Sequence, residues 1–227
     1  MSMDLISQTF QAIGYLLLLV VLTVLWVKTV RQAELRRFWI LLALAWTMNL
    51  FGNIAWIVHD LVTGTELDNF SLVDLFYVAH YGLIAAALWL VPKSLSRRAG
   101  LWIAGVMLVA AVLVWSIYFT PAMTLRGGPW TNFLGVAMYP VLDAGLVTLA
   151  WLRLRAARGS TWDRVALLLF CSVASYGIAN TLNMTGYIFS PIAGGLLPNL
   201  FWILTDVFIL ILALGSPRAS ETPAEAG

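Results

Sequence analysis

Charged residues are scarce in this sequence. Asp, Glu, Lys and Arg make up 11% of the 227 residues, whereas a soluble globular domain carries roughly 25%. Hydrophobic residues make up 61%, and the mean hydropathy is +0.89. This balance excludes a soluble enzyme, a disordered segment and a nucleic-acid-binding protein. It predicts an all-α integral membrane protein in contact with the lipid bilayer, because a helix satisfies its own backbone hydrogen bonds inside a membrane.

Residues that ligate metals or attack substrates are equally few. The single cysteine, Cys171, excludes a disulfide framework and any CxxC motif. The two histidines, His59 and His80, are expected at different depths and so do not form a bis-histidine haem pair. The sequence contains no HExxH motif, no Cys/His cluster, no GxSxG elbow and no phosphate-binding glycine loop. We therefore predict no catalytic residues, no metal site and no enzymatic activity.

Lysine is almost absent, which excludes one class of seven-helix protein. Covalent retinal needs a lysine in the last membrane span to form a Schiff base. The only lysines are Lys28 and Lys93, at the borders of spans, and the segment 198–215 has none. Covalent retinal is excluded, and the sequence specifies no other cofactor.

What the sequence has in abundance is long apolar runs. A helix of about 20 residues crosses the roughly 30 Å hydrocarbon core of a bilayer. Seven stretches reach or approach that length: residues 9–28, 38–58, 74–91, 100–120, 131–152, 164–187 and 198–215. We expect seven transmembrane helices that form a single domain over residues 1–215. Residues 216–227 are mostly small or polar, and we expect them to form a disordered cytoplasmic tail.

The cationic residues predict the orientation. Of the 13 Lys and Arg residues, all but Arg126 fall on one side of the expected bundle. They are Lys28, Arg31, Arg36, Arg37, Lys93, Arg97, Arg98, Arg153, Arg155, Arg158, Arg164 and Arg218. Cytoplasmic loops carry an excess of such residues, so we expect the N-terminus outside and the C-terminus in the cytoplasm. The basic face fits contact with anionic lipids or with an acidic protein partner.

The chain also resembles itself. A shift of 125 residues places the segment 74–81 on 199–206, and Trp26 on Trp151. In the second span of each half the register slips by about two residues, and Asn53 then falls on Asn180. The pattern predicts a 3+1+3 plan, in which two three-helix units enter the membrane in the same direction and one helix links them.

Polar side chains recur inside the apolar spans. Ionisable groups there cost roughly 2.5–3.5 kcal/mol each, so they need partners or a function. The candidate ligand-binding residues are Asn49, Asn53, His80, Tyr139, Asp143, Tyr176, Asn180, Asn183 and Asp206. Most of them are expected from the middle of the membrane outwards, which predicts a polar pocket that opens to the extracellular side. For the asparagines, hydrogen bonding between helices is the competing interpretation.

Three segments carry a resemblance to a known family. DLFYVAHYGLIAAAL, MYPVLDAGLVTLAWLRL and NLFWILTDVFILILAL resemble the multi-helix membrane sensor regions that lie N-terminal to bacterial diguanylate cyclase and related signalling modules. The matching positions are Asp74, Tyr77, Tyr139, Pro140, Asp143, Trp202 and Asp206. The resemblance implies a bacterial sensor in the inner (cytoplasmic) membrane. No output module follows Arg218, so it implies a stand-alone sensor, or one that signals through a separate cytoplasmic or membrane protein partner.

Three functions are consistent with these observations. The first is a seven-helix sensor or ligand-binding protein. The second is a small-solute transporter built from the two repeats, with Asp143, Asp206 and His80 as its coupling or substrate site. The third is an accessory subunit of a membrane complex, in which the polar residues serve only assembly. The oligomeric state, including a homo-oligomer, is left open by the sequence.

Overall fold

The computed structural model describes residues 3–63, 71–91, 95–96, 98–127, 130–189 and 195–215. Every regular element in these ranges is a helix, and they contain no β-strand. The prediction of an all-α protein is therefore confirmed. The expected tail, residues 216–227, lies outside the described residues, as do Lys93, Arg97 and Arg218.

The helices follow the apolar runs closely. They are α1 (Met3–Arg31), α2 (Arg36–Thr63), α3 (Asp74–Trp89), α4 (Ala99–Val114), α5 (Thr120–Arg126), α6 (Leu134–Ala157), α7 (Asp163–Phe189) and α8 (Leu196–Gly215). A π-helical turn, Trp115–Phe119, joins α4 to α5, and a 3₁₀ turn, Trp130–Phe133, precedes α6. Cationic residues flank the connection between the first two helices: Lys28 and Arg31 lie in the last turn of α1, and α2 begins at Arg36.

Six helical segments are long and apolar enough to cross a membrane. They correspond to α1, α2, α4 with its extension into α5, α6, α7 and α8. The chain is thus an all-helical protein built for multiple membrane passages. The third expected span is apolar but has only 16 residues, about 24 Å at 1.5 Å per residue, which falls short of the roughly 30 Å hydrocarbon core.

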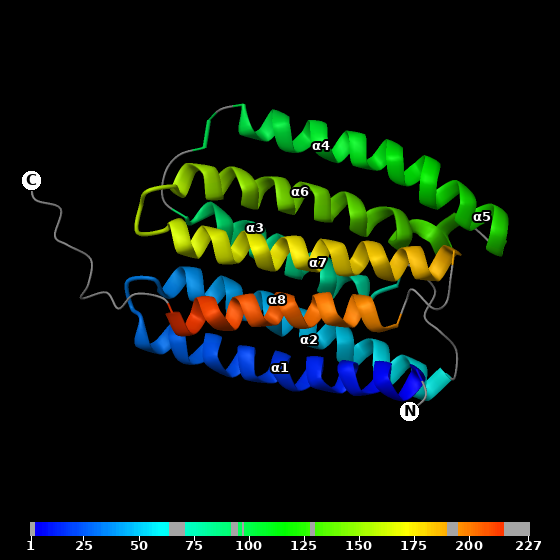
Figure 1. Ribbon diagram of the computed structural model, residues 1–227, viewed down its shortest axis with the longest axis horizontal. Coiled ribbons are helices and arrows are strands. Elements are labelled where there is room, and N and C mark those ends of the chain that lie inside the picture. The colour runs from blue at the N-terminus through cyan, green and yellow to red at the C-terminus, as the bar shows by residue number, and fades with distance from the viewer. Residues whose placement is uncertain are drawn as a thin grey trace, which may run out of the picture.

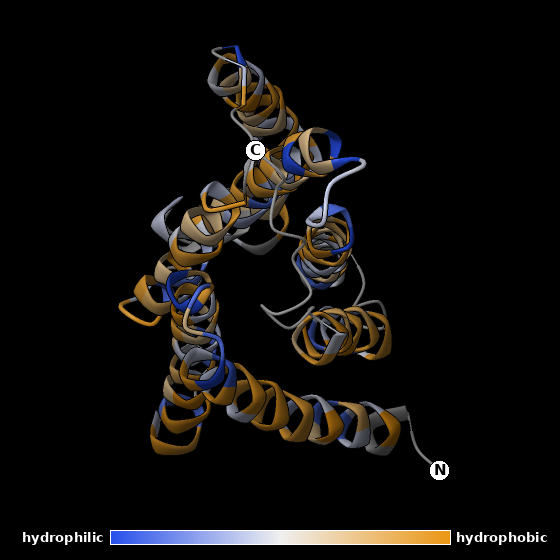
Figure 2. Ribbon diagram, turned by 90° about the vertical axis from the view of Figure 1, so that its left-hand side faces the viewer, coloured by the Kyte–Doolittle hydropathy of each residue, from blue (hydrophilic) through white to orange (hydrophobic). Residues whose placement is uncertain are grey.

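Six helices pack in a closed cyclic order. Contacts join α1 to α2, α2 to α3, α3 to α6, α6 to α7, α7 to α8, and α8 back to α1. Helix α4 packs on the outside of α6 (Figure 1). The end-on view shows apolar residues along the lengths of the helices and hydrophilic residues mainly at their ends and turns (Figure 2). This distribution suits a bundle surrounded by lipid.

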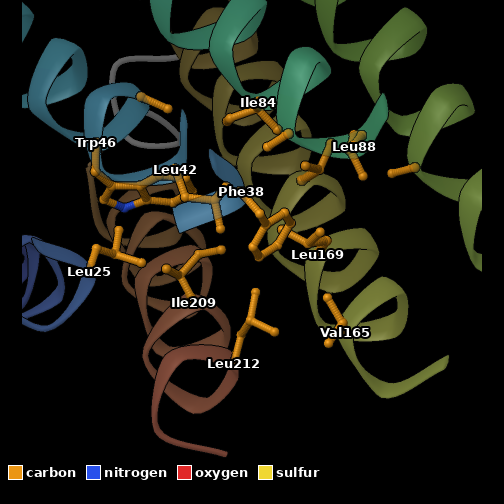
Figure 3. Close-up of a cluster of buried hydrophobic side chains, with 14 of the residues drawn as sticks. Leu25, Phe38, Leu42, Trp46, Ile84, Leu88, Val165, Leu169, Ile209 and Leu212 are labelled. Carbon is orange, nitrogen blue, oxygen red and sulfur yellow. The ribbon is translucent and has the colours of Figure 1, made fainter. Parts of the chain in front are cut away.

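The interior of this ring is apolar toward the end where α1 finishes and α2 begins. Buried side chains from several of its helices meet there (Figure 3). They include Leu25, Phe38, Leu42, Trp46, Ile84, Leu88, Leu169, Ile209 and Leu212. These apolar side chains pack closely against one another and fill this part of the ring interior. Most of the buried polar side chains lie in the other part of the ring. Trp46 lies at the border between the two parts.

Arg153 lies beyond the expected end of its span at residue 152, but the helix continues past it. We expected it on the cytoplasmic side, around the connection that follows this span; it lies in the last turns of α6 and is only 3% exposed. Its Nη1 donates to the carbonyl of Val91 at 3.2 Å and its Nη2 to that of Trp89 at 3.3 Å. The guanidinium also lies 4.7 Å from the centre of the Trp89 ring. Arg153 thereby satisfies carbonyl groups that the end of short helix α3 leaves without helical partners.

We expect Arg153→Leu to lower the free energy of unfolding by about 1–3 kcal/mol, because it leaves these carbonyls without donors at a buried site. Reversible unfolding in mixed micelles, followed by circular dichroism, measures this change. The matched control is Arg155→Leu, since Arg155 is exposed on the same helix. Equal effects of the two substitutions would contradict a specific role for Arg153.

Candidate functional site

The centre of the polar region is the carboxylate of Asp143 on α6. The Tyr81 hydroxyl, from α3, donates to Asp143 Oδ1 at 2.5 Å. The Asn180 amide, from α7, donates to Asp143 Oδ2 at 3.2 Å and lies 2.9 Å from the Tyr81 hydroxyl. The Trp202 indole on α8 donates to Asn180 Oδ1 at 3.2 Å. Four helices are therefore tied together by one buried carboxylate and one amide.

The second buried carboxylate, Asp206 on α8, is held differently. The indole Nε1–H of Trp46 donates to Asp206 Oδ1 at 2.7 Å, across the ring from α2. Within the described ranges, no Lys or Arg pairs with Asp206 or with Asp143. Both carboxylates thus lie in the interior of the bundle without a cationic partner from the described chain, which is unusual for acidic groups at membrane depth.

His80 on α3 contacts a donor to each carboxylate: Trp46, which bonds Asp206, and Tyr81, which bonds Asp143. Its Nδ1 lies 2.8 Å from the carbonyl oxygen of Ala45, and because a carbonyl only accepts, Nδ1 carries the hydrogen. The ring is 1% exposed and packs against Trp46, Tyr176 and Tyr81, at centroid distances of 5.2, 5.3 and 6.1 Å. Its Nε2 is buried and has no hydrogen-bond partner among the described residues.

A second set of contacts extends from α2. The Tyr77 hydroxyl donates to Asn53 Oδ1 at 3.3 Å, and the Asn53 amide donates to the carbonyl of Asn49 at 2.9 Å. The Tyr77 ring lies against Gly52, where an added Cβ would come within 2.8 Å of Tyr77 Cζ. Gly52 is therefore the residue that allows Tyr77 to approach α2.

Tyr139 joins this second set to the Asp143 centre. Its ring lies 6.2 Å from that of Tyr77 and 6.2 Å from that of Tyr81. Its hydroxyl donates a short hydrogen bond to Asp74 Oδ1. The other oxygen of Asp74 accepts the backbone N–H of Ser71 at 2.5 Å, at the start of α3. Hydrogen bonds and ring contacts thus form one continuous cluster from α2 to α8.

Eight of the nine sequence-predicted residues lie in one cluster. Asn49, Asn53, His80, Tyr139, Asp143, Tyr176, Asn180 and Asp206 all belong to this cluster. Asn183 does not, because its side chain is exposed. The next residue of α7, Met184, is buried instead, and it packs with Phe119, Ala122 and Phe133. The convergence of the side chains is established, while the expected pocket among them stays a prediction.

Two central residues, Trp46 and Tyr81, are absent from the sequence-based set. Trp46 lies three residues before Asn49 and seven before Asn53, so the helical period places all three on one face. Tyr81 follows Tyr77 by four residues, which gives the same relation on α3. This spacing was the available signal. It is weak in a chain with 11 tryptophans and 7 tyrosines, most of which serve packing or the membrane interface.

The glycines of α2 and α3 provide a matched pair for testing the packing of Tyr77. We expect Gly52→Ala to displace the Tyr77 ring and to cost about 1–3 kcal/mol of stability, as overpacking does in other cores. An alanine at Gly82 would meet no atom within 4 Å, so Gly82→Ala should be neutral or stabilising by up to about 1 kcal/mol. Melting temperatures in detergent measure both, and a stabilising Gly52→Ala would refute the close contact.

Comparison with known proteins adds no identity to this geometry. The chain matches no protein-family model, and neither the curated proteins nor the solved structures include a detectable relative.

Proposed function

We propose that the protein is a seven-helix sensor or ligand-binding protein of the bacterial cytoplasmic membrane, acting through a separate protein partner. The observation that carries this proposal is the buried cluster of two carboxylates, one imidazole and several aromatic rings in the ring interior. Packing alone does not require ionisable groups at such a cost. The resemblance to membrane sensor regions, noted at Asp74, Tyr139, Asp143 and Asp206, points the same way, because these residues lie in or beside the cluster.

We also infer the 3+1+3 internal repeat, and two pairs of hydrogen bonds support it. Tyr77 donates to Asn53 at 3.3 Å, and Trp202 donates to Asn180 at 3.2 Å. The donors are related by a shift of 125 residues and the acceptors by 127, which is the slip already noted in the sequence. The same side-chain contact between the second and third helices of each unit therefore occurs twice.

The second pair obeys the same two offsets. His80 donates to the carbonyl of Ala45 at 2.8 Å. The Thr205 hydroxyl, which lies 3.0 Å from the carbonyl of Phe201 in its own helix, also lies 3.4 Å from the carbonyl of Ser172. The cyclic helix order also maps onto itself when α1, α2 and α3 are exchanged for α6, α7 and α8. These paired contacts support an internal repeat over chance similarity between apolar helices.

A transporter is the second candidate, because such repeats suit alternating access. The apolar packing of the ring interior argues against a transporter. It fills the end where α1 finishes and α2 begins, and Phe38, Leu88 and Leu212 are buried there (Figure 3). A transported polar solute would need an alternative conformation that opens this part. A receptor needs only the polar part, which favours the sensor.

Labelling of single cysteines tests the proposed orientation. With Cys171 replaced by serine, we expect Thr63→Cys, at the exposed end of α2, to react with an impermeant thiol reagent in intact cells. Glu34→Cys, exposed between α1 and α2, should react only after the cells are opened. The basic residues near Glu34 predict this difference. The reverse labelling pattern would overturn the orientation.

Native mass spectrometry of the purified protein tests the proposed function. We expect a small molecule to be retained by the parent protein and by Asn183→Ala, which alters an exposed residue outside the cluster. Asp206→Asn should lose it while the protein stays folded. A protein that retains nothing, and whose proteoliposomes show a substrate-driven pH change abolished by Asp143→Asn, would refute the sensor and favour the transporter.

A further inference from the structure

The hydrogen-bond arrangement of the described residues around His80 is incomplete. Its Nδ1–H is used by the Ala45 carbonyl, so the neutral ring offers a lone pair at Nε2. That atom is buried and has no donor among the described residues. Buried polar atoms in native proteins nearly always have a partner, either from the protein or from a bound molecule. The lone pair of His80 Nε2 is therefore an acceptor that the described residues leave unused.

Asp206 has a single donor from the described chain in the same region. Only its Oδ1 accepts a hydrogen bond, from Trp46, and the described chain supplies no donor to Oδ2. Asp143 differs, because Tyr81 and Asn180 donate to its two oxygens. The two carboxylates are thus unequal: both oxygens of Asp143 accept hydrogen bonds from the described chain, whereas only one oxygen of Asp206 does.

The two incomplete acceptors share one neighbour, the Trp46 indole. Its N–H bonds Asp206, and its ring lies 5.2 Å from that of His80. Tyr176 contacts the imidazole from α7, and Tyr81 packs against both rings. This environment favours a cation that can donate hydrogen bonds. It combines a carboxylate oxygen, an imidazole lone pair and electron-rich aromatic faces.

We propose that the cluster binds the ammonium group of a small primary amine, or the ammonium ion itself, against Trp46 between His80 and Asp206. This inference rests on the proposed ligand-binding function and specifies its ligand class. One N–H donates to His80 Nε2, a second donates to the free oxygen of Asp206, and the positive charge offsets the carboxylate. A neutral alcohol would leave that charge uncompensated, and a quaternary ammonium has no N–H to donate.

The experiment uses the full-length protein in detergent micelles at matched ionic strength. Methylammonium, butylammonium and ammonium chlorides are titrated against tetramethylammonium and sodium chlorides, by calorimetry and by melting temperature. We expect saturable stabilisation by ligands with N–H donors and none by tetramethylammonium or sodium. The ammonium and butylammonium arms distinguish the bare ion from an alkylamine.

Variants assign the effect to the site. Asp206→Asn and His80→Phe should each weaken methylammonium binding at least tenfold, and Asn183→Ala, which alters an exposed residue outside the cluster, should not. His80→Gln retains an acceptor oxygen and should bind better than His80→Phe, which separates loss of binding from loss of folding. Equal binding by Asp206→Asn, equal stabilisation by tetramethylammonium, or no saturable effect of any amine would overturn the proposal.

The failure of this inference can be distinguished from failure of the proposed function. An uncharged molecule retained by the parent protein and lost from Asp206→Asn would overturn the amine and leave the ligand-binding function intact. Absence of any retained or titrated ligand would overturn both.

Discussion

Trp46→Ala is expected to destabilise the bundle by about 3–5 kcal/mol, the range for truncating a large buried aromatic side chain. Trp46 is 1% exposed, packs against His80 and supplies the hydrogen bond to Asp206. Its loss therefore combines a cavity with an unpaired carboxylate. Reversible unfolding in mixed micelles measures the change.

Phenylalanine substitutions separate these two contributions. Trp46→Phe retains most of the ring but removes the N–H, which should cost about 1–3 kcal/mol because Asp206 is buried. The control is Trp39→Phe: Trp39 is equally buried, but its N–H donates to Gln32, which is uncharged and only partly buried. Similar costs for the two substitutions would show that the Asp206 bond contributes little.

Asn180→Ala is expected to cost about 1.5–3 kcal/mol, since the amide donates to the carboxylate of Asp143 and accepts from Trp202. The control, Asn183→Ala, changes an exposed asparagine on the same helix and should stay within about 0.5 kcal/mol of the parent. Combining Asn180→Ala with Trp202→Phe should give a coupling energy of about 0.5–3 kcal/mol. Strict additivity would mean that Trp202 and Asn180 act independently.

Much of the helical layout could be predicted from the apolar runs alone. The run 164–187 became α7, Asp163–Phe189, and the run 198–215 became α8, Leu196–Gly215. Such agreement is expected, because the bilayer fixes the length of a spanning helix and permits little else. The run 131–152 is less regular: its first turn is a 3₁₀ turn and α6 continues to Ala157. Hydropathy does not distinguish these turns.

The candidate site was predictable in part, for a reason that lies in residue chemistry. An aspartate or asparagine within an apolar run is conspicuous, so Asp143, Asn180 and Asp206 could be identified. Tyr81 and Trp46 could not be separated from the many other aromatic residues, because their role depends on which helix lies opposite. Arg153 illustrates the same limit, since its burial against Trp89 follows from where the short helix α3 ends.

The central claim is that the cluster around Trp46 is a ligand site and not only a contact between helices. An experimental density map of the protein as purified from its membrane tests this most directly. We predict non-protein density against Trp46, within hydrogen-bond distance of His80 Nε2 and of the second oxygen of Asp206. A well-resolved map in which side chains of the protein itself supply donors to both atoms, with no room for a bound molecule, would contradict the claim.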